Sequence, residues 1–158
     1  MTSDQEHTCD YLYHNVGALE PGLETVPRTE PLGDKWGYEH LKDIQQARSD
    51  VDWSVTFAQD QANVRLRLLG ESGTELYFGT GMANNPPAPC PMAVVRRRGK
   101  ATQFVALMEP CRDQPTVTSS RQVKTPDGTL TCEIPKGTER YRLVLGKDKA
   151  TLAHDTVR

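Results

Sequence analysis

Nowhere does the 158-residue sequence approach the roughly 20 consecutive apolar residues that a membrane-spanning helix needs. Its first residues, 1–6, are polar and acidic and lack the apolar stretch of a secretory signal peptide. The sequence therefore predicts no membrane span. It places the chain either inside a cell or downstream of a leader that is not part of it.

Neither sign of charge dominates. The formal net charge is −2 and the isoelectric point is about 6.1, so no general basic field attracts nucleic acid or an anionic membrane. A local exception is the basic cluster Arg96, Arg97, Arg98 and Lys100. This cluster is either the solvated end of a strand or a docking point for carboxylate or sulfate groups.

The signatures of the common enzyme classes are also missing. There is no GxSxG, HExxH, P-loop or GxGxxG after a strand, and without a CxxC a zinc ribbon or thioredoxin-like site is unsupported. Four cysteines are present: Cys9, Cys90, Cys111 and Cys132. They are either unpaired, partly buried thiols or include a Cys90–Cys111 disulfide, which would need an oxidising compartment.

The composition is that of a soluble globular protein, with 36% hydrophobic and 25% charged residues. A chain of this length buries about two-thirds of its unfolded surface, which is enough for a core without metals or disulfides. We expect one domain over residues 1–158. In it, residues 1–33 form an N-terminal strand and a proline-containing loop, and residues 34–158 form the main body.

Apolar residues recur with a period of two from residue 51 onward, which predicts strands with one buried face. About eight short strands joined by Gly/Pro turns, without room for helical crossovers, predict an all-β antiparallel sandwich. The strands are expected at residues 51–57, 64–68, 74–78, 92–97, 102–108, 117–124, 129–134 and 140–145, with 149–153 as a further candidate.

Other segments have a less regular pattern. Residues 38–48 have helical spacing and are either a short helix or a bulged strand. Residues 82–91 contain four prolines and are expected to be an irregular surface loop. Residues 98–100 are expected to be a tight connection, with the apolar 102–108 as a central strand. The sequence Thr-Pro-Asp-Gly at 125–128 is the clearest turn.

Side chains capable of chemistry are densest at residues 7–17, His-Thr-Cys-Asp-Tyr-Leu-Tyr-His-Asn-Val-Gly. Imidazole, carboxylate and thiolate groups bind zinc, and tyrosine or histidine transfers protons. In an extended strand, however, Asp10 and His14 lie on one face and His7 on the other, so one ion would need further ligands. The alternative is an ordinary polar, aromatic-rich first strand.

Two segments resemble a known family. Residues 7–17 are similar to the H-T-Y-D-(aromatic)-x-x-H-x-x-G stretch of heparinase II/III-like polysaccharide lyases, with Cys9 in place of the tyrosine. Residues 94–110, Val-Val-Arg-Arg-Arg-Gly-Lys-Ala-Thr-Gln-Phe-Val-Ala-Leu-Met-Glu-Pro, resemble a segment of the C-terminal β-sandwich in the same family. The two segments occur in the expected order, and the likeness fades after residue 110.

The resemblance implies the C-terminal β-sandwich of a lyase that cleaves uronic-acid-containing polysaccharides. An N-terminal α/α toroid supplies most catalytic groups of such enzymes, which are periplasmic or extracellular. A zinc ion lies in their sandwich, and the resemblance implies His7 as one ligand. The partner histidine and aspartate of that site would lie upstream of the first motif, where this chain has only six residues.

β-Elimination needs neutralisation of the uronate carboxylate, a base for the C5 proton and an acid for the leaving oxygen. Tyr11, Tyr13 and His14 are candidates for the proton transfers, and nothing in the sequence selects among them. We therefore expect a sandwich without lyase activity of its own. The alternatives are a module that binds acidic glycans through Arg96, Arg97, Arg98 and Lys100, and a structural sandwich that docks another domain through its first strand.

Overall fold

The computed structural model describes residues 2–34, 37–83, 87–117, 119–125, 129–146 and 148–156. Its fold is the expected all-β antiparallel sandwich, and thirteen strands lie in these ranges. Contacts group the chain into two compact units, Met1–Asp113 and Gln114–Arg158. The expected single domain over residues 1–158 stays a prediction.

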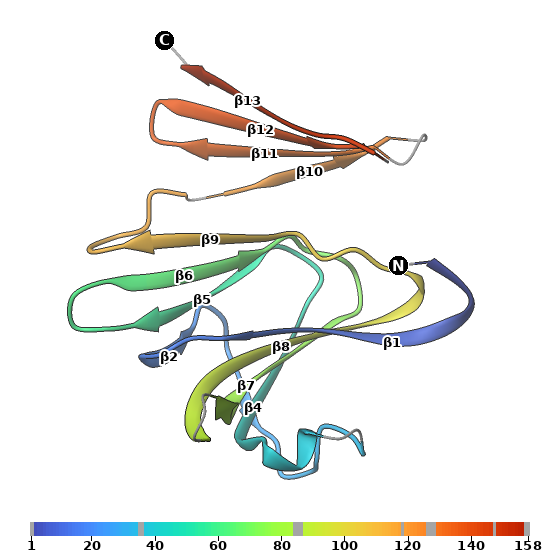
Figure 1. Cartoon of the computed structure of the whole chain (residues 1–158), viewed down its shortest axis with the longest axis vertical. Helices are drawn as coiled ribbons and strands as arrows, with labels where there is room; N and C mark the ends of the chain where they lie inside the picture. The colour runs from blue at the N-terminus through green and yellow to red at the C-terminus, as the bar shows by residue number, and fades with distance from the viewer. Residues whose placement is uncertain are drawn as a thin grey trace. The chain divides into compact units, whose positions relative to one another are not determined.

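A five-stranded antiparallel sheet forms one layer of the first unit (Figure 1). Its order is β1-β8-β7-β4-β3, so the N-terminal strand pairs with a strand more than eighty positions later in the sequence. The strands are β1 (Thr2–His14), β3 (Val26–Pro27), β4 (Lys42–Ser49), β7 (Thr74–Ala83) and β8 (Ala88–Ala101).

A four-stranded sheet with the order β2-β5-β6-β9 forms the second layer. Its strands are β2 (Ala18–Pro21), β5 (Trp53–Ala58), β6 (Asn63–Leu68) and β9 (Ala106–Cys111). Alternation along β5 buries Trp53, Val55 and Phe57, as the period of two predicts. The inner faces of both sheets share one core of Trp53, Val55, Phe57, Leu66, Leu68, Leu76, Phe78, Ala93 and Val95.

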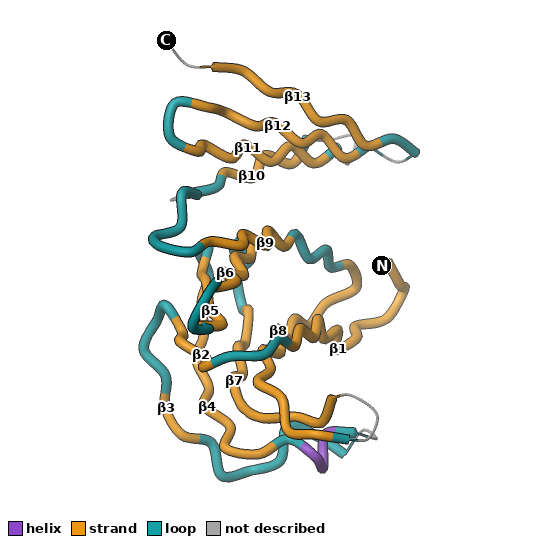
Figure 2. Tube along the Cα trace, turned by 60° about the vertical axis from the view of Figure 1, so that its left-hand side comes forward, coloured by secondary structure: helices purple, strands orange, loops and turns teal. Residues whose placement is uncertain are grey.

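The outer face of the five-stranded sheet carries a second, smaller core. The segment between β3 and β4 crosses this face and brings Leu32 and Tyr38 onto it (Figure 2). They pack with the outward-facing side chains Ile44, Tyr77, Met92 and Val94. The sheet is therefore covered on both faces over part of its area, and charged residues of the same face lie beside an apolar patch.

The segment 38–48 is the bulged strand rather than the helix. Only Tyr38–His40 forms a 3-10 turn, and β4 follows with a register irregularity between Lys42 and Gln45. Asp43 has a positive φ of 53° at this bulge. On the neighbouring strand a Cβ at Gly79 would lie 2.7 Å from the Lys42 carbonyl oxygen. Glycine at position 79 therefore permits the close approach of the two backbones.

The expected loop at 82–91 was wrong, because β7 continues to Ala83 and β8 begins at Ala88. The Pro91 carbonyl accepts a hydrogen bond from the Asn15 amide at 3.3 Å. Since the amide and carbonyl of one residue point to the same side of a strand, Pro89 and Pro91 lack their amides on the side of β1, which ends at His14. The ladder with β7 is thus compatible with both prolines.

The expected connection at 98–100 and the central strand at 102–108 were also wrong. Strand β8 continues to Ala101 and pairs Arg98 with Thr8 and Gly99 with His7. The next strand is β9, an edge strand of the other sheet as far as the described residues show, and its Met108 is 57% exposed. The apolar residues on both faces of 102–108 therefore do not mean that both faces of this segment are buried.

The second unit holds a four-stranded meander of β10 (Arg121–Lys124), β11 (Leu130–Lys136), β12 (Glu139–Leu145) and β13 (Ala150–Thr156). The last three correspond to expected strands, whereas only the end of 117–124 is a strand. Of the expected turn at 125–128, residues 126–128 lie outside the described residues. Alternation along β11 buries Leu130, Cys132 and Ile134.

Cys90 and Cys111 are free thiols, so the candidate Cys90–Cys111 disulfide is not formed. Cys90 lies on β8 of the five-stranded sheet, and its thiol donates to the Asn15 carbonyl at 3.3 Å. Cys111 ends β9 in the four-stranded sheet. The two cysteines therefore belong to different layers of the sandwich.

Candidate functional site

The first segment that carries the family resemblance lies on β1, and the second begins on β8, the neighbouring strand, and continues into β9 of the other sheet. Strand β1 pairs antiparallel with β8 over nearly its whole length, in a register that places Asp10 opposite Arg96. Figure 1 shows β1 alongside β8 in the five-stranded sheet. The first motif and the β8 part of the second, although distant in the sequence, therefore lie side by side in one sheet.

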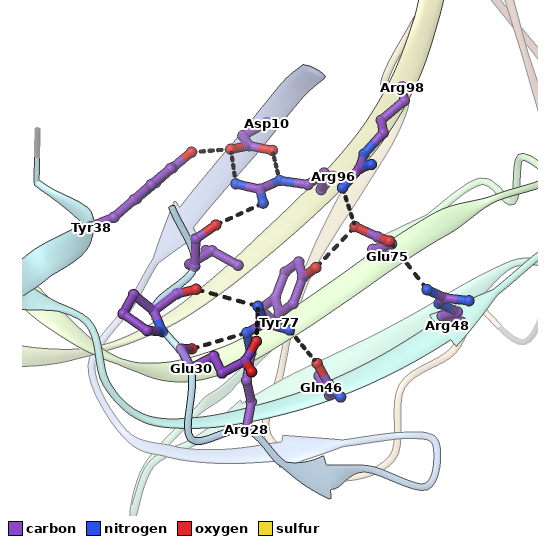
Figure 3. Close-up of polar contacts among 12 residues, drawn as sticks. Asp10, Arg28, Glu30, Tyr38, Gln46, Arg48, Glu75, Tyr77, Arg96 and Arg98 are labelled. Carbon is purple, nitrogen blue, oxygen red and sulfur yellow. Dashed lines mark hydrogen bonds and ion pairs between the residues drawn. The ribbon is translucent and has the colours of Figure 1, made fainter. Parts of the chain in front are cut away.

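Asp10 and Arg96 form a buried bidentate ion pair on the outer face of the sheet. Arg96 Nε donates to one carboxylate oxygen at 2.8 Å and Nη2 to the other at 2.9 Å. The Tyr38 hydroxyl also donates to Asp10, and Arg96 Nη1 donates to the Leu32 carbonyl at 2.8 Å (Figure 3). The pair thus fastens the segment between β3 and β4 to the sheet.

Hydrogen bonding and burial shift the pKa values of two groups in this cluster. The hydrogen bond to Asp10 raises the pKa of Arg96, although burial opposes it. Burial, followed by the hydrogen bond to Asp10, raises the pKa of Tyr38 above its usual value. Arg96 binds both carboxylate oxygens of Asp10, and only 10% of its own side chain is exposed. It therefore has little capacity for a ligand.

Arg97 points to the opposite face and is equally occupied. Its guanidinium donates to Thr74 Oγ1 at 3.0 Å, to the Leu69 carbonyl at 2.8 Å and to the Gln103 carbonyl at 2.7 Å. It also pairs with Glu71 at 3.0 Å and lies 4.8 Å from the centroid of the Phe104 ring. Burial lowers its pKa. Arg97 therefore ties together the loops at one end of the sandwich.

Arg98 and Lys100 return to the outer face, and both are exposed. The side chain of Arg98 is 60% exposed, and it forms an ion pair with Glu75 at 3.7 Å. Of the four basic residues expected to bind a glycan, two are thus held within the protein and two face solvent. Glycan binding by this cluster stays a prediction.

A row of alternating charges crosses four strands of the outer face. The register places Asp10, Arg96, Glu75 and Arg48 side by side on β1, β8, β7 and β4. Glu75 lies between two arginines, because Arg48 approaches it at 3.4 Å from one neighbouring strand and Arg98 approaches it from the other (Figure 3). The Tyr77 hydroxyl donates to the same carboxylate at 2.9 Å.

A groove of about 330 Å³ lies at this end of the row. It is lined by Val26, Arg28, Gln46, Ala47, Arg48, Glu75 and Tyr77. Arg28 is fixed by hydrogen bonds to Gln46 at 2.9 Å and to the Glu30 carbonyl at 3.0 Å, and it lies 5.6 Å from the Tyr77 ring centroid. Volumes of roughly 300–1,000 Å³ are typical of small-molecule sites, so this groove suits a small ligand.

Neither Arg48 nor Glu75 was a candidate from the sequence. Single charged residues on a strand are the usual pattern of a solvated face, so Arg48 and Glu75 gave no signal by themselves. Only the register of β8, β7 and β4 brings these charges together. Once the strand pairing is known, opposite charges that lie directly across from each other on paired strands identify Arg48 and Glu75.

His7 lies on β1 near an open cavity of about 580 Å³, which also involves Asp10, Gln103 and Phe104. Its Nε2 is 2.8 Å from Ser3 Oγ. Among the described residues there is no group of three or more His, Cys, Asp or Glu side chains placed to hold a metal ion. Asp10, the nearest carboxylate in the motif, is engaged by Arg96. The residues that the structure describes thus give no complete ligand set around His7, and zinc binding stays a prediction.

The candidates for proton transfer occupy different environments. Tyr11 and Tyr13 face the shared core, where their rings lie 5.8 Å from Phe104 and 5.3 Å from Phe57. Burial raises the pKa of Tyr11, which disfavours a tyrosinate base there. His14, at the end of β1, is exposed. The two tyrosines thus have a packing role within the sandwich.

No known family model matches the chain, and no curated protein matches it. Within the described residues, none of the helical structure has the length and apolar character to cross a membrane.

Proposed function

We propose that the chain is the C-terminal β-sandwich portion of a heparinase II/III-like polysaccharide lyase, and that it contacts an acidic polysaccharide without cleaving it. The observation that carries this proposal is the pairing of the two motif strands. Asp10 of the first motif and Arg96 of the second form the buried ion pair that locks β1 to β8. Two segments linked only by a resemblance are therefore one structural unit.

The distribution of side chains favours a supporting role. Arg48 and Arg98 have the charge to neutralise a uronate carboxylate, whereas Tyr11 and Tyr13 are occupied in the core. The base and acid of β-elimination would come from an α/α toroid in the full-length enzyme. A zinc ion bound in such an enzyme would contribute positive charge, and His7 is the residue of this chain that the resemblance assigns to it.

The test is an assay of the purified chain with heparin, heparan sulfate, alginate and chondroitin sulfate. Formation of unsaturated products is followed by ultraviolet absorbance, with a full-length lyase as the positive control. We expect no turnover with any of the four polysaccharides. Turnover that survives further purification would overturn the proposal, because it would require a complete catalytic site in this chain.

A glycan-binding module unrelated to a lyase is the second candidate, and the exposure of Arg98 and Lys100 on one face favours it. Retention on an acidic-polysaccharide column that weakens with salt is expected in both cases. The two candidates differ when a toroid domain of a heparinase II/III-like lyase is added. Formation of a complex or a gain of lyase activity supports the first candidate, and retention without either supports the second.

A further inference from the structure

The ion pairs around Glu75 differ in kind from the pair of Asp10 and Arg96. Glu75 is shared between two guanidiniums at 3.4 Å and 3.7 Å, and neither contact is a close bidentate bond. The side chains of Arg48 and Arg98 are 83% and 60% exposed. Glu75 itself is 20% exposed, but both contacts are long and both arginines lie in solvent. Each pair therefore contributes little stability, and an external anion can replace Glu75 at small cost.

One carboxylate cannot neutralise two arginines. Asp10 is already bound by Arg96, and Glu30 lies 3.9 Å from Arg28. Arg48 and Arg98 therefore leave a surplus of positive charge around Glu75, although the whole chain has a net charge of −2. The surplus lies at the edge of the groove lined by Arg28, Arg48 and Tyr77.

The geometry around Glu75 shows which anion fits. Arginines on β4 and β8 converge on a carboxylate that lies on the strand between them. The Tyr77 hydroxyl adds a third donor to the same group. A planar carboxylate suits the fork of a guanidinium, which can bind both of its oxygens.

We propose that Arg48 and Arg98 form a binding site for the carboxylate of an anionic sugar, and that Glu75 occupies this site as a built-in competitor. The sugar ring enters the adjoining groove, where Arg28 and Gln46 supply polar contacts. This site rests on the proposed function, because it specifies where the sandwich would hold a uronic-acid polysaccharide. The ligand carboxylate takes the arginine contacts that Glu75 makes in its absence.

The proposal predicts opposite effects for neighbouring charges. Glu75→Gln keeps an acceptor for the Tyr77 hydroxyl but removes the competing charge, so affinity for an alginate oligosaccharide should rise about 3- to 10-fold. Arg48→Gln and Arg98→Gln should each lower that affinity about 10-fold. Isothermal titration calorimetry of the full chain measures these effects, and thermal unfolding confirms that each variant is folded.

Matched variants control for the overall field of the protein. Glu24→Gln and Arg112→Gln make the same changes in net charge at exposed positions outside the groove and should leave affinity within about 2-fold of the parent. Dextran sulfate, which has sulfates but no carboxylates, tests the choice of anion. We expect the Glu75 and Arg48 substitutions to change the affinity for dextran sulfate less than they change the affinity for alginate oligosaccharide.

Three results would overturn the site. They are equal gains from Glu24→Gln and Glu75→Gln, an unchanged affinity after both arginine substitutions, or no binding of alginate oligosaccharide by either the parent or Glu75→Gln. A stronger effect of the arginines on dextran sulfate than on alginate would overturn the assignment to a carboxylate. These binding measurements are independent of the lyase assay and of complex formation with a toroid domain. The proposed function is decided by those two experiments, so it can fail or stand separately from this site.

Discussion

Two groups of arginines on the same sheet have opposite environments. Arg96 and Arg97 are buried, and their guanidiniums are engaged by carboxylates, carbonyls and a hydroxyl. Arg48 and Arg98 are exposed and share one carboxylate. The difference teaches that basic residues adjacent in a sequence need not form one binding surface. Arg97 faces the opposite layer from its neighbours, and on the outer face Arg96 contacts the segment of Leu32 and Tyr38 whereas Arg98 faces solvent. We expect stability to depend on the first group, and we propose ligand binding for the second.

The largest expected effect is that of Asp10→Ala. Removing the carboxylate leaves the Arg96 guanidinium buried without its partner, which costs about 3–5 kcal/mol of unfolding free energy. Urea denaturation followed by tryptophan fluorescence measures the loss. Glu75→Gln on the exposed side of the row is the matched comparison, with an expected change below about 1 kcal/mol. Equal losses in the two variants would remove the distinction between the two groups.

Arg97→Met should destabilise the first unit by about 2–4 kcal/mol, because the carbonyls of Leu69 and Gln103 and the Thr74 hydroxyl lose a shared donor. Methionine preserves much of the apolar volume beside Phe104. The same urea experiment compares it with Arg98→Met, which should lose less than about 1 kcal/mol. A larger loss for Arg98→Met would contradict the assigned roles.

The fall in unfolding free energy at alkaline pH should depend on Tyr38. Burial raises the pKa of this hydroxyl in the folded protein, and its hydrogen bond to Asp10 adds to the effect. Below the ordinary tyrosine value of about 10 both states are protonated, and this stabilisation is fully present. Above that value the unfolded state releases the proton first, so stability falls as pH rises towards the folded pKa.

Tyr38→Phe should therefore reduce the slope of unfolding free energy against pH above about pH 10. Tyr77, whose pKa is also raised chiefly by burial, should retain its own contribution to that slope. Urea denaturation at a series of alkaline pH values measures the change. An identical slope in the parent and the variant would show that the Tyr38 hydroxyl is not coupled to folding.

The smallest effect on stability is expected for Lys100→Gln. Lys100 is exposed near the end of β8, so the free energy of unfolding should change by less than about 0.5 kcal/mol. Urea denaturation of this variant, with the parent measured in parallel, checks the value. A loss comparable with that of Arg97→Met would place Lys100 with the buried group and alter the comparison.

Much of the all-β architecture was predictable from local pattern. Alternation in 51–57 and 64–68 predicted strands that the structure confirms as β5 and β6, with Trp53, Val55, Phe57, Leu66 and Leu68 in the core. Val51, which the same alternation placed on the buried face, precedes β5 and is 70% exposed. The pattern failed where backbone pairing decides the outcome. Pro89 and Pro91 are tolerated in β8 because their missing amides face away from β7, a fact that depends on where β1 ends.

The candidate site was less predictable than the fold. The basic cluster drew attention to Arg96 and Arg97, which are internal, and gave no indication of Arg48 or Glu75. These residues lie 27 positions apart in the sequence, and a charge has no visible partner until strands are paired. The same limit applies to Asp10, whose place in the first motif suggested a metal ligand, whereas the structure pairs it with Arg96.

The sequence by itself determined the class of fold, because side chains alternate between the two faces of a strand and their polarity records which face is buried. Only the tertiary structure decided the strand order, the register and the state of each arginine. Pairing across a sheet joins residues that are distant in the chain, and the resulting burial and hydrogen bonds determine whether a guanidinium holds the protein together or remains available to a ligand.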